Sequence, residues 1–217
     1  MKLYLSPGAC SLADHIALHE ADMTFEKVKV DLKTKRTEDG RDFNQINPKS
    51  YVPALELENG EVLTENVAIM TFISDRARLA DPDGDLGRYR LIEMLTFIST
   101  EIHKQFKPFF DPNGDQVAKA KAAEKIGTRF KYLAGRMTDD YLFGDEFSVA
   151  DGYLFTMLTW AKNNNLDIPE RLETFFRTML ARPAVTLALQ HEGLGDKYSS
   201  SASSRDADQF EARTAGP

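Results

Sequence analysis

The sequence contains one cysteine, Cys10, and one tryptophan, Trp160, among its 217 residues. A single cysteine excludes an internal disulfide, and a free thiol suits the reducing cytoplasm. The four histidines have no cysteine partners at the spacing of zinc sites, so no metal ion is predicted. His15 and His19 lie four residues apart, but such a pair is more often a surface or core feature than a metal site.

Long apolar runs and an excess of positive charge are also lacking. No run approaches the length that crosses a bilayer, and Pro7, Gly8 and Asp14 interrupt any signal-peptide core. Lys and Arg number 27 against 34 Asp and Glu, so the formal charge of -7 offers no electrostatic footprint for nucleic acid. We therefore expect a cytoplasmic globular protein with neither a membrane nor a nucleic acid as partner.

The first 75 or so residues have the pattern of strands and helices in alternation. Strands are expected at 2–5 and 25–30, with a helix at 12–20 between them. Residues 31–48 are polar and predict a loop with at most a short helix. Asn59-Gly60 joins two alternating runs at 52–57 and 61–64, which is a strong hairpin signal, and a helix is expected at 65–75. This order is βαβ followed by ββα.

After the breaker cluster at 81–85, which is the predicted linker, no strong strand pattern recurs. Helices are expected at 88–106, 116–138, from 149 onward, at 170–181 and at 184–192. Ser148 and Asp151 resemble a capping box, and the helix they begin is apolar nearly all round, which is typical of a buried helix. Gly152 should weaken that helix by roughly 1 kcal/mol relative to Ala. We expect domains at 1–78 and 88–194 and a disordered tail at 195–217.

Cys10 lies in a turn between a predicted strand and the N-terminus of a predicted helix. The positive end of the helix dipole favours the thiolate, which is the reactive form. A small buried apolar residue is the alternative, because free cysteine is among the most buried residue types. The local pattern leaves these two interpretations equal.

The Val52-Pro53 bond begins a predicted strand and is a candidate for a cis peptide. A cis bond would turn the backbone groups of Val52 toward Cys10, where an extended peptide can pair with them as an added strand. An ordinary proline at a sheet edge is the alternative.

Glu65 and Asn66 begin the helix expected at 65–75. Free backbone N–H groups at a helix N-terminus attract a carboxylate, and Glu65 can accept from an ammonium group. The two together would suit the headgroup of an amino acid. A simple helix cap is the alternative.

Thr96, Thr100 and His103 share one face of the helix expected at 88–106. If this face lies opposite Cys10, His103 can hydrogen-bond or protonate a sulfur atom. A solvated polar stripe is the alternative.

Several short motifs occur in a specific order and spacing. They are Lys2-Leu3-Tyr4, Cys10-Ser11-Leu12, Asp31-Leu32-Lys33-Thr34-Lys35, Asn47-Pro48, Val52-Pro53, Leu63-Thr64-Glu65, Glu101-Ile102-His103-Lys104, Ser148-Val149-Ala150-Asp151 and Glu192-Gly193-Leu194. With them the chain resembles the glutathione S-transferases of the bacterial beta class, from Met1 to about Leu194. Leu5, Asn66 and Thr96 depart from the residues usual in that class, and Asp14 places a carboxylate near the thiol, which would raise its pKa.

The resemblance implies a fold that combines an α/β domain with an all-α domain. The N-terminal domain would be thioredoxin-like, with a mixed four-stranded sheet, and the C-terminal domain would be all-helical. It also implies a homodimer that binds glutathione and a small apolar electrophile, with no metal. Glutathione would lie along Val52-Pro53, and Cys10 would hold it as a mixed disulfide. The other glutathione-binding positions implied are Lys35, Glu65, Asn66, Thr96, Thr100, His103 and Lys104, and Trp160 would lie near the electrophile.

These observations predict a glutathione transferase that also exchanges disulfides through Cys10, with His103 as its catalytic partner. The alternative is a non-catalytic protein of the same fold that carries apolar ligands or binds a protein. Cys10, Lys35, Glu65 and His103 argue against a carrier, because a carrier needs none of them. Scattered helix positions line such a pocket, so the pattern does not identify the electrophile.

Overall fold

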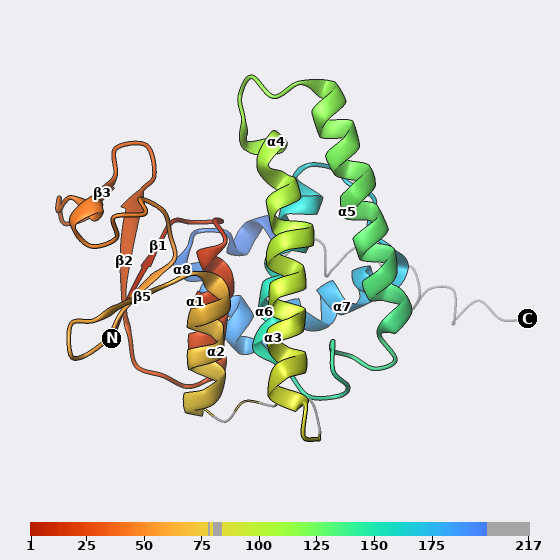
Figure 1. Ribbon diagram of the computed structural model, residues 1–217, viewed down its shortest axis with the longest axis horizontal. Helices are drawn as coiled ribbons and strands as arrows, with labels where there is room; N and C mark the ends of the chain where they lie inside the picture. Colours follow the sequence, from red (N-terminus) through yellow and green to blue (C-terminus); the bar gives the residue numbers. More distant parts are fainter. Residues whose placement is uncertain (78, 80–83, 199–217) are drawn as a thin grey trace, which may run out of the picture.

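The computed structural model describes residues 1–77, 79 and 84–198. The strands gather at one side of the molecule and most helices at the other, with α1 and α2 beside the sheet (Figure 1). This arrangement confirms the predicted fold, in which a thioredoxin-like unit precedes an all-helical one. In the described residues no helix has the length and apolar character needed to cross a membrane.

The sheet has the strand order β3-β2-β1-β4-β5. Its strands are β1 (Lys2–Leu5), β2 (Glu26–Asp31), β3 (Arg36–Thr37), β4 (Ala54–Glu56) and β5 (Val62–Thr64). Strand β1 pairs with β2 in parallel and with β4 in antiparallel, and β4 pairs with β5 across the predicted hairpin. The sheet is therefore mixed, as predicted.

The fifth strand, β3, lies in the segment predicted to be a loop. The Asp31 side chain accepts from the backbone N–H of Lys33 and Thr34, and the Lys35 N–H donates to the Asp31 carbonyl at 2.8 Å. Lys35 has a positive φ of 57°, which completes the reversal. The chain thus folds back on itself, and β3 pairs with the end of β2. A two-residue strand made by a turn has no alternating pattern that would predict it.

The helices of the sheet-containing unit are α1 (Ser11–Glu20), the short 3-10 helix η1 (Phe43–Gln45) and α2 (Asn66–Ala77). Helix α1 follows β1 directly, and α2 follows β5. Leu3, Leu5 and Leu55 on one sheet face join the main hydrophobic core with both helices. On the other face, Tyr4 and Val28 pack with Phe43 of η1 in a smaller cluster.

The helix predicted at 88–106 runs in one direction (Figure 1), but its backbone changes from α to π to 3-10 helix along its length. It begins as α3 (Gly87–Phe97), continues as a π-helical segment, η2 (Ile98–Ile102), and tightens into a 3-10 segment, η3 (His103–Phe106). Helix α4 (Lys107–Phe110) follows. The π segment precedes His103 directly, and such segments often occur at functional sites.

The remaining helices are α5 (Gln116–Arg136), α6 (Val149–Asn163), α7 (Glu170–Leu180) and α8 (Pro183–His191). The capping box predicted at Ser148 and Asp151 is present at the start of α6. Helix α6 is buried from Val149 to Ala161, as its apolar pattern predicted. Helix α1 packs against both α6 and α8, so it is shared by the two units.

The predicted tail begins with an ordered segment. Residues 195–198 are helical, and Tyr198 is buried against Phe176, with its hydroxyl on Asn163 Oδ1 at 3.2 Å. The packed chain therefore extends beyond the predicted boundary at 194. The rest of the predicted tail, 199–217, and most of the predicted linker lie outside the described residues.

Candidate active site

Cys10 is the N-cap residue of α1 and is half-buried. Its Sγ donates to the Val52 carbonyl at 3.4 Å. The Val52-Pro53 peptide is cis, as the sequence suggested. The thiol therefore lies against the backbone that begins strand β4.

The surroundings of this thiol oppose the helix N-terminus. The pKa of Cys10 is raised to about 12, mainly by burial, then by the charge of Asp14, as the sequence suggested, and least by Glu65. Hydrogen bonds from the backbone N–H groups of Cys10 and Ser11 lower this pKa. Of the two interpretations that the sequence left equal, the pKa favours the buried neutral thiol in the protein without ligand, because burial outweighs the helix.

Glu65 precedes α2 with a positive φ of 75° and presents its carboxylate at the surface. The carboxylate accepts from Lys49 Nζ and from the Tyr51 hydroxyl, each at 2.6 Å. These two hydrogen bonds, led by that of Lys49, lower the pKa of Glu65. Lys49 and Tyr51 were not predicted, although both lie just before Val52-Pro53.

Asn66 is buried and faces α1. Its amide donates to the Cys10 carbonyl at 3.0 Å and to Asp14 Oδ2 at 2.8 Å. The side chain is therefore engaged within the protein. What position 66 can still offer a ligand is its backbone N–H, at the N-terminus of α2.

Lys35 is half-buried, and its ammonium donates to the Ser50 carbonyl at 2.8 Å. It therefore lies next to the segment that leads into Val52-Pro53. Its role in binding a ligand stays a prediction.

His103 contributes a neutral imidazole. Its Nδ1 lies 2.7 Å from the hydroxyl of Tyr153, which is fully buried on α6. Burial, with a smaller effect of Lys104, lowers the pKa of His103 to about 4. The neutral ring can donate or accept a hydrogen bond at neutral pH, which favours the hydrogen-bonding role over the acid role, and its catalytic role stays a prediction.

Tyr153 was predicted only as part of a buried helix. Burial raises its pKa, and the charges of Cys10, Asp14 and Glu65 add to that effect. The hydroxyl therefore stays protonated. It lies close enough to Cys10 that a thiolate there would raise the pKa of the hydroxyl. A helix that is apolar all round gives no signal that one tyrosine hydroxyl serves a site.

Trp160 is 6% exposed, and its indole N–H donates to the Gly8 carbonyl at 2.7 Å. Its ring makes edge contacts with His103, Phe106 and Phe110 at centroid distances of 5.0, 5.4 and 4.7 Å. Trp160 thus holds the turn that carries Cys10. Phe110 is exposed, unlike Trp160. The role of Trp160 near an electrophile stays a prediction.

Thr96, Thr100 and Lys104 are all exposed. The Thr100 hydroxyl donates to the Thr96 carbonyl at 2.9 Å. Lys104 lies near enough to Glu65 that its charge lowers the pKa of that carboxyl. The helical unit therefore brings the cation of Lys104 toward Glu65, at the start of α2.

Glu192, just after α8, reaches the turn that carries Cys10. Its carboxylate accepts from the Gly8 N–H at 2.7 Å and pairs with His15 Nδ1 at 2.9 Å. The residue is buried, which raises its pKa to about 7. The motif Glu192-Gly193-Leu194 marked this position, but its role in holding Gly8 depends on the folded chain.

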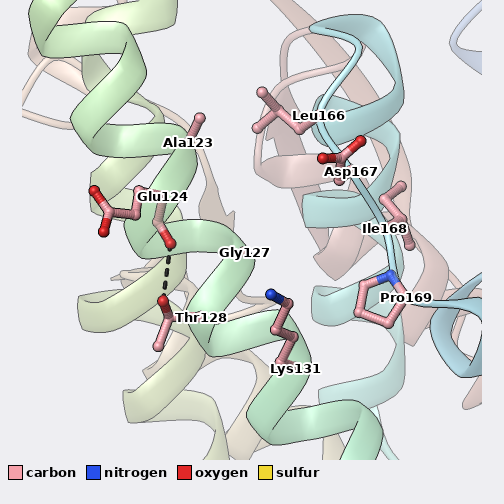
Figure 2. A pocket seen from close by; sticks show the side chains of 9 residues that line it. All are labelled: Ala123, Glu124, Gly127, Thr128, Lys131, Leu166, Asp167, Ile168 and Pro169. Atoms are coloured by element: carbon pink, nitrogen blue, oxygen red, sulfur yellow. Dashed lines mark hydrogen bonds between the residues drawn. The ribbon is translucent and has the colours of Figure 1, made fainter.

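A cavity of about 590 Å³ lies elsewhere, between α5 and the segment 166–169 (Figure 2). Figure 2 shows Lys131 and Glu124 on one side and Leu166, Asp167 and Ile168 on the other. None of the candidate residues lines it. This cavity is therefore not part of the Cys10 site.

Comparison with known proteins agrees with this architecture. Residues 1–75 match the glutathione S-transferase N-terminal domain, and residues 96–183 match the C-terminal domain. The glutathione S-transferase GstA of Escherichia coli O157:H7 is 42% identical over 200 residues, which is 89% of this chain and 100% of that protein.

Two solved structures extend the likeness. A sphingomonad glutathione S-transferase complexed with glutathione and a bacterial beta class enzyme from Sphingomonas chungbukensis are each 46% identical, with a TM-score of 0.82. Each comparison covers 89% of this chain and 100% of the other. Both domains match in order, and named transferases match most of the length, which favours an enzyme over a non-catalytic carrier. The chain therefore belongs to the glutathione S-transferase family.

Proposed function

We propose that this enzyme conjugates glutathione to small apolar electrophiles and also exchanges disulfides through a mixed disulfide at Cys10. The contact that carries the proposal is Cys10 Sγ on the Val52 carbonyl at 3.4 Å. It places a thiol beside the backbone where an extended peptide would add to the sheet. The bound glutathione of the sphingomonad relative supports the choice of tripeptide.

The charged groups around Val52 match the charges of glutathione. The γ-glutamyl ammonium would meet Glu65, and its carboxylate would meet the backbone N–H groups at the start of α2. Lys35 would meet the glycine carboxylate at the other end. Thr96, Thr100 and Lys104 would approach from the helical unit, as the resemblance implies.

Ligand binding would also make the thiol more reactive. Glu65 is one of the groups that raise the pKa of Cys10, and a bound ammonium would offset its negative charge. The Cys10 thiolate would then attack one sulfur of glutathione disulfide. One sulfur–sulfur bond forms and one breaks, and a glutathione thiolate leaves. A second glutathione thiolate would attack the mixed disulfide and restore Cys10.

His103 would orient the sulfur by a hydrogen bond. In this proposal the Tyr153 hydroxyl, 2.7 Å from Nδ1 of His103, donates to that nitrogen. The proton of the neutral ring then lies on Nε2, which can donate to a thiolate. In conjugation that thiolate belongs to glutathione, held against an apolar partner near Phe110.

The test is the intact mass of the protein after treatment with glutathione disulfide. We expect the wild type to gain one glutathione, a reductant to reverse the gain, and Cys10→Ser to gain none. Conjugation of 1-chloro-2,4-dinitrobenzene should persist in Cys10→Ser, because glutathione supplies its own sulfur.

Absence of an adduct between pH 6 and 9 would contradict disulfide exchange at Cys10. Absence of conjugation in both proteins would contradict the transferase part for this class of electrophile.

The resemblance further supports a cytoplasmic homodimer, which we include in the proposal. The chain has a mass of 24.4 kDa. Light scattering during gel filtration should give about twice that mass, whereas the mass of one chain at micromolar concentration would contradict the dimer.

A further inference from the structure

Three of the four histidines meet on the side of α1 that faces α8. His15 and His19 come from α1, and His191 is the last residue of α8. One ring nitrogen of each lies within 4.8 Å of those of the other two. The ring centroids are 5.0 to 5.7 Å apart. From the sequence only the pair on α1 could be recognised, because His191 lies 172 positions beyond His19.

One nitrogen of each ring has no hydrogen-bond partner in the described part of the chain. These atoms are Nε2 of His15, Nε2 of His19 and Nδ1 of His191, and all three are buried. A buried polar atom without a partner costs about 1–3 kcal/mol, so native proteins rarely keep several together without a function. Three histidines that each bring a ring nitrogen within 4.8 Å of the others can supply the three protein ligands of a metal site.

The partner of His15 fixes which of its nitrogens can bind a cation. The Glu192 carboxylate lies 2.9 Å from Nδ1 of His15 and also accepts from the Gly8 N–H. A proton held on Nδ1 by this carboxylate leaves the lone pair on Nε2, the buried nitrogen that has no partner in the described residues. A carboxylate behind a histidine is the usual second contact of a metal-binding imidazole, where it orients the ring and raises its basicity.

The surroundings keep the rings in the form that binds metals. Burial lowers the pKa of His15 and of His19 to about 4, so both are neutral at pH 7. The Phe25 ring packs against both, with centroids at 5.7 and 5.0 Å, and makes that flank of the cluster apolar. The positive charge of Lys27 lowers the pKa of all three histidines. The same charge would repel a bound cation.

We propose that His15, His19 and His191 form a binding site for a divalent transition-metal ion of the zinc type. Tetrahedral zinc with bonds of about 2.1 Å needs nitrogens about 3.4 Å apart, so rings whose nitrogens lie within 4.8 Å of one another would turn toward the ion on binding. A water molecule would take the fourth position. This site is separate from the glutathione site, and the proposal does not depend on the reaction the enzyme catalyses.

The test uses untagged full-length protein, freed of metal and titrated with Co²⁺. We expect one equivalent to produce the visible ligand-field absorption of cobalt, and Zn²⁺ to remove it by competition. His19→Gln and His191→Gln should each weaken binding by at least about tenfold, because each removes a ligand.

Two matched variants distinguish this site from others. Cys10→Ser should bind cobalt as the wild type does, which separates the histidines from the thiol. Lys27→Gln should bind more tightly, because it removes a positive charge beside the cluster. Circular dichroism on every variant would verify that the fold is intact.

A measurement on the wild type keeps the test independent of how the variants fold. X-ray absorption of the zinc-loaded protein should show nitrogen and oxygen neighbours and no sulfur. Three outcomes would overturn the proposal: no cobalt absorption at one equivalent, binding that survives both histidine substitutions, or a sulfur neighbour of zinc.

Discussion

The thiol of Cys10 is held in its neutral form by its surroundings. Burial is the main cause, and Asp14 and Glu65 contribute negative charge from α1 and from the start of α2. The helix N-terminus alone would have favoured the opposite state. The free protein therefore keeps its only cysteine protected against indiscriminate oxidation or alkylation.

This raised pKa predicts a particular pH dependence of alkylation. With a pKa of about 12, the thiolate fraction of Cys10 should rise about tenfold for each pH unit between 6 and 9. The rate of iodoacetamide modification, followed by mass spectrometry, should rise in parallel without levelling off. Free glutathione under the same conditions is the control, and a midpoint below pH 8 for Cys10 would contradict the prediction.

Trp160 acts on the same turn through a single hydrogen bond. Trp160→Phe keeps a ring among His103, Phe106 and Phe110 but removes the N–H that donates to Gly8. We expect the free energy of unfolding in urea to fall by about 1–2 kcal/mol. The turn should also loosen, so Cys10 should be alkylated faster than in the wild type. An unchanged alkylation rate would show that Trp160 does not hold the turn.

At the scale of elements, Gly152 lies where α6 packs against α1. A Cβ at position 152 would lie 3.4 Å from the Ala13 carbonyl oxygen and 3.5 Å from Ile16 Cγ2, which is ordinary van der Waals contact. From the sequence, Gly152 was expected only to weaken α6. In the structure the space beside it holds a methyl group but not a larger side chain.

Two substitutions separate these roles of Gly152. Gly152→Ala should change the free energy of unfolding by less than about 1 kcal/mol, because better helix propensity offsets the close contact. Gly152→Val should destabilise by about 1–3 kcal/mol, since its branches enter packed space. Gly135→Ala on α5, where nothing lies within 4 Å, is the control and should stabilise. Equal stability of the Val and Ala variants in urea would contradict this account.

Elements governed by neighbouring residues were predictable from the sequence. The hairpin at Asn59-Gly60, the capping box at Ser148 and the buried helix after it all follow from local patterns, and the structure has each of them. Features that depend on distant residues were not. The link from Gly8 to Glu192 and the meeting of His191 with α1 are set by tertiary packing, which leaves no periodic trace.

In the candidate site, too, features set by neighbouring residues were predictable and features set by packing were not. Cys10 and Val52-Pro53 could be recognised because turn chemistry marks them in the sequence. The state of the thiol could not, since burial is a property of the whole fold. Asn66 was predicted as a contact for the headgroup, but its amide faces Asp14, which only the packing of α2 on α1 decides.

At the scale of the whole molecule, α1 joins the sheet to the helical unit. Besides its packing on α6 and α8, Glu20 at its end accepts from Arg182 Nε and Nη2 at 2.5 and 2.7 Å. Arg182 also donates to the Tyr141 hydroxyl at 2.5 Å. Hydrogen bonds and apolar packing thus connect the two units along the length of one helix.

This shared helix predicts that the two units unfold together. Trp160 fluorescence reports the contact between the units, and far-ultraviolet circular dichroism reports helices throughout. Urea transitions followed by the two signals should coincide, as in a two-state protein. Fluorescence that changes at lower urea than circular dichroism would show that the units separate before they unfold.

The hydrogen bond from Gly8 to Glu192 joins residues 184 positions apart. During translation Gly8 is made well before Glu192, which is added only after all the helices from α1 to α8. The turn that carries Cys10 therefore lacks this hydrogen bond until Glu192 has been made. Its thiol reaches the native environment only when Glu192 has left the ribosome and packed against α1.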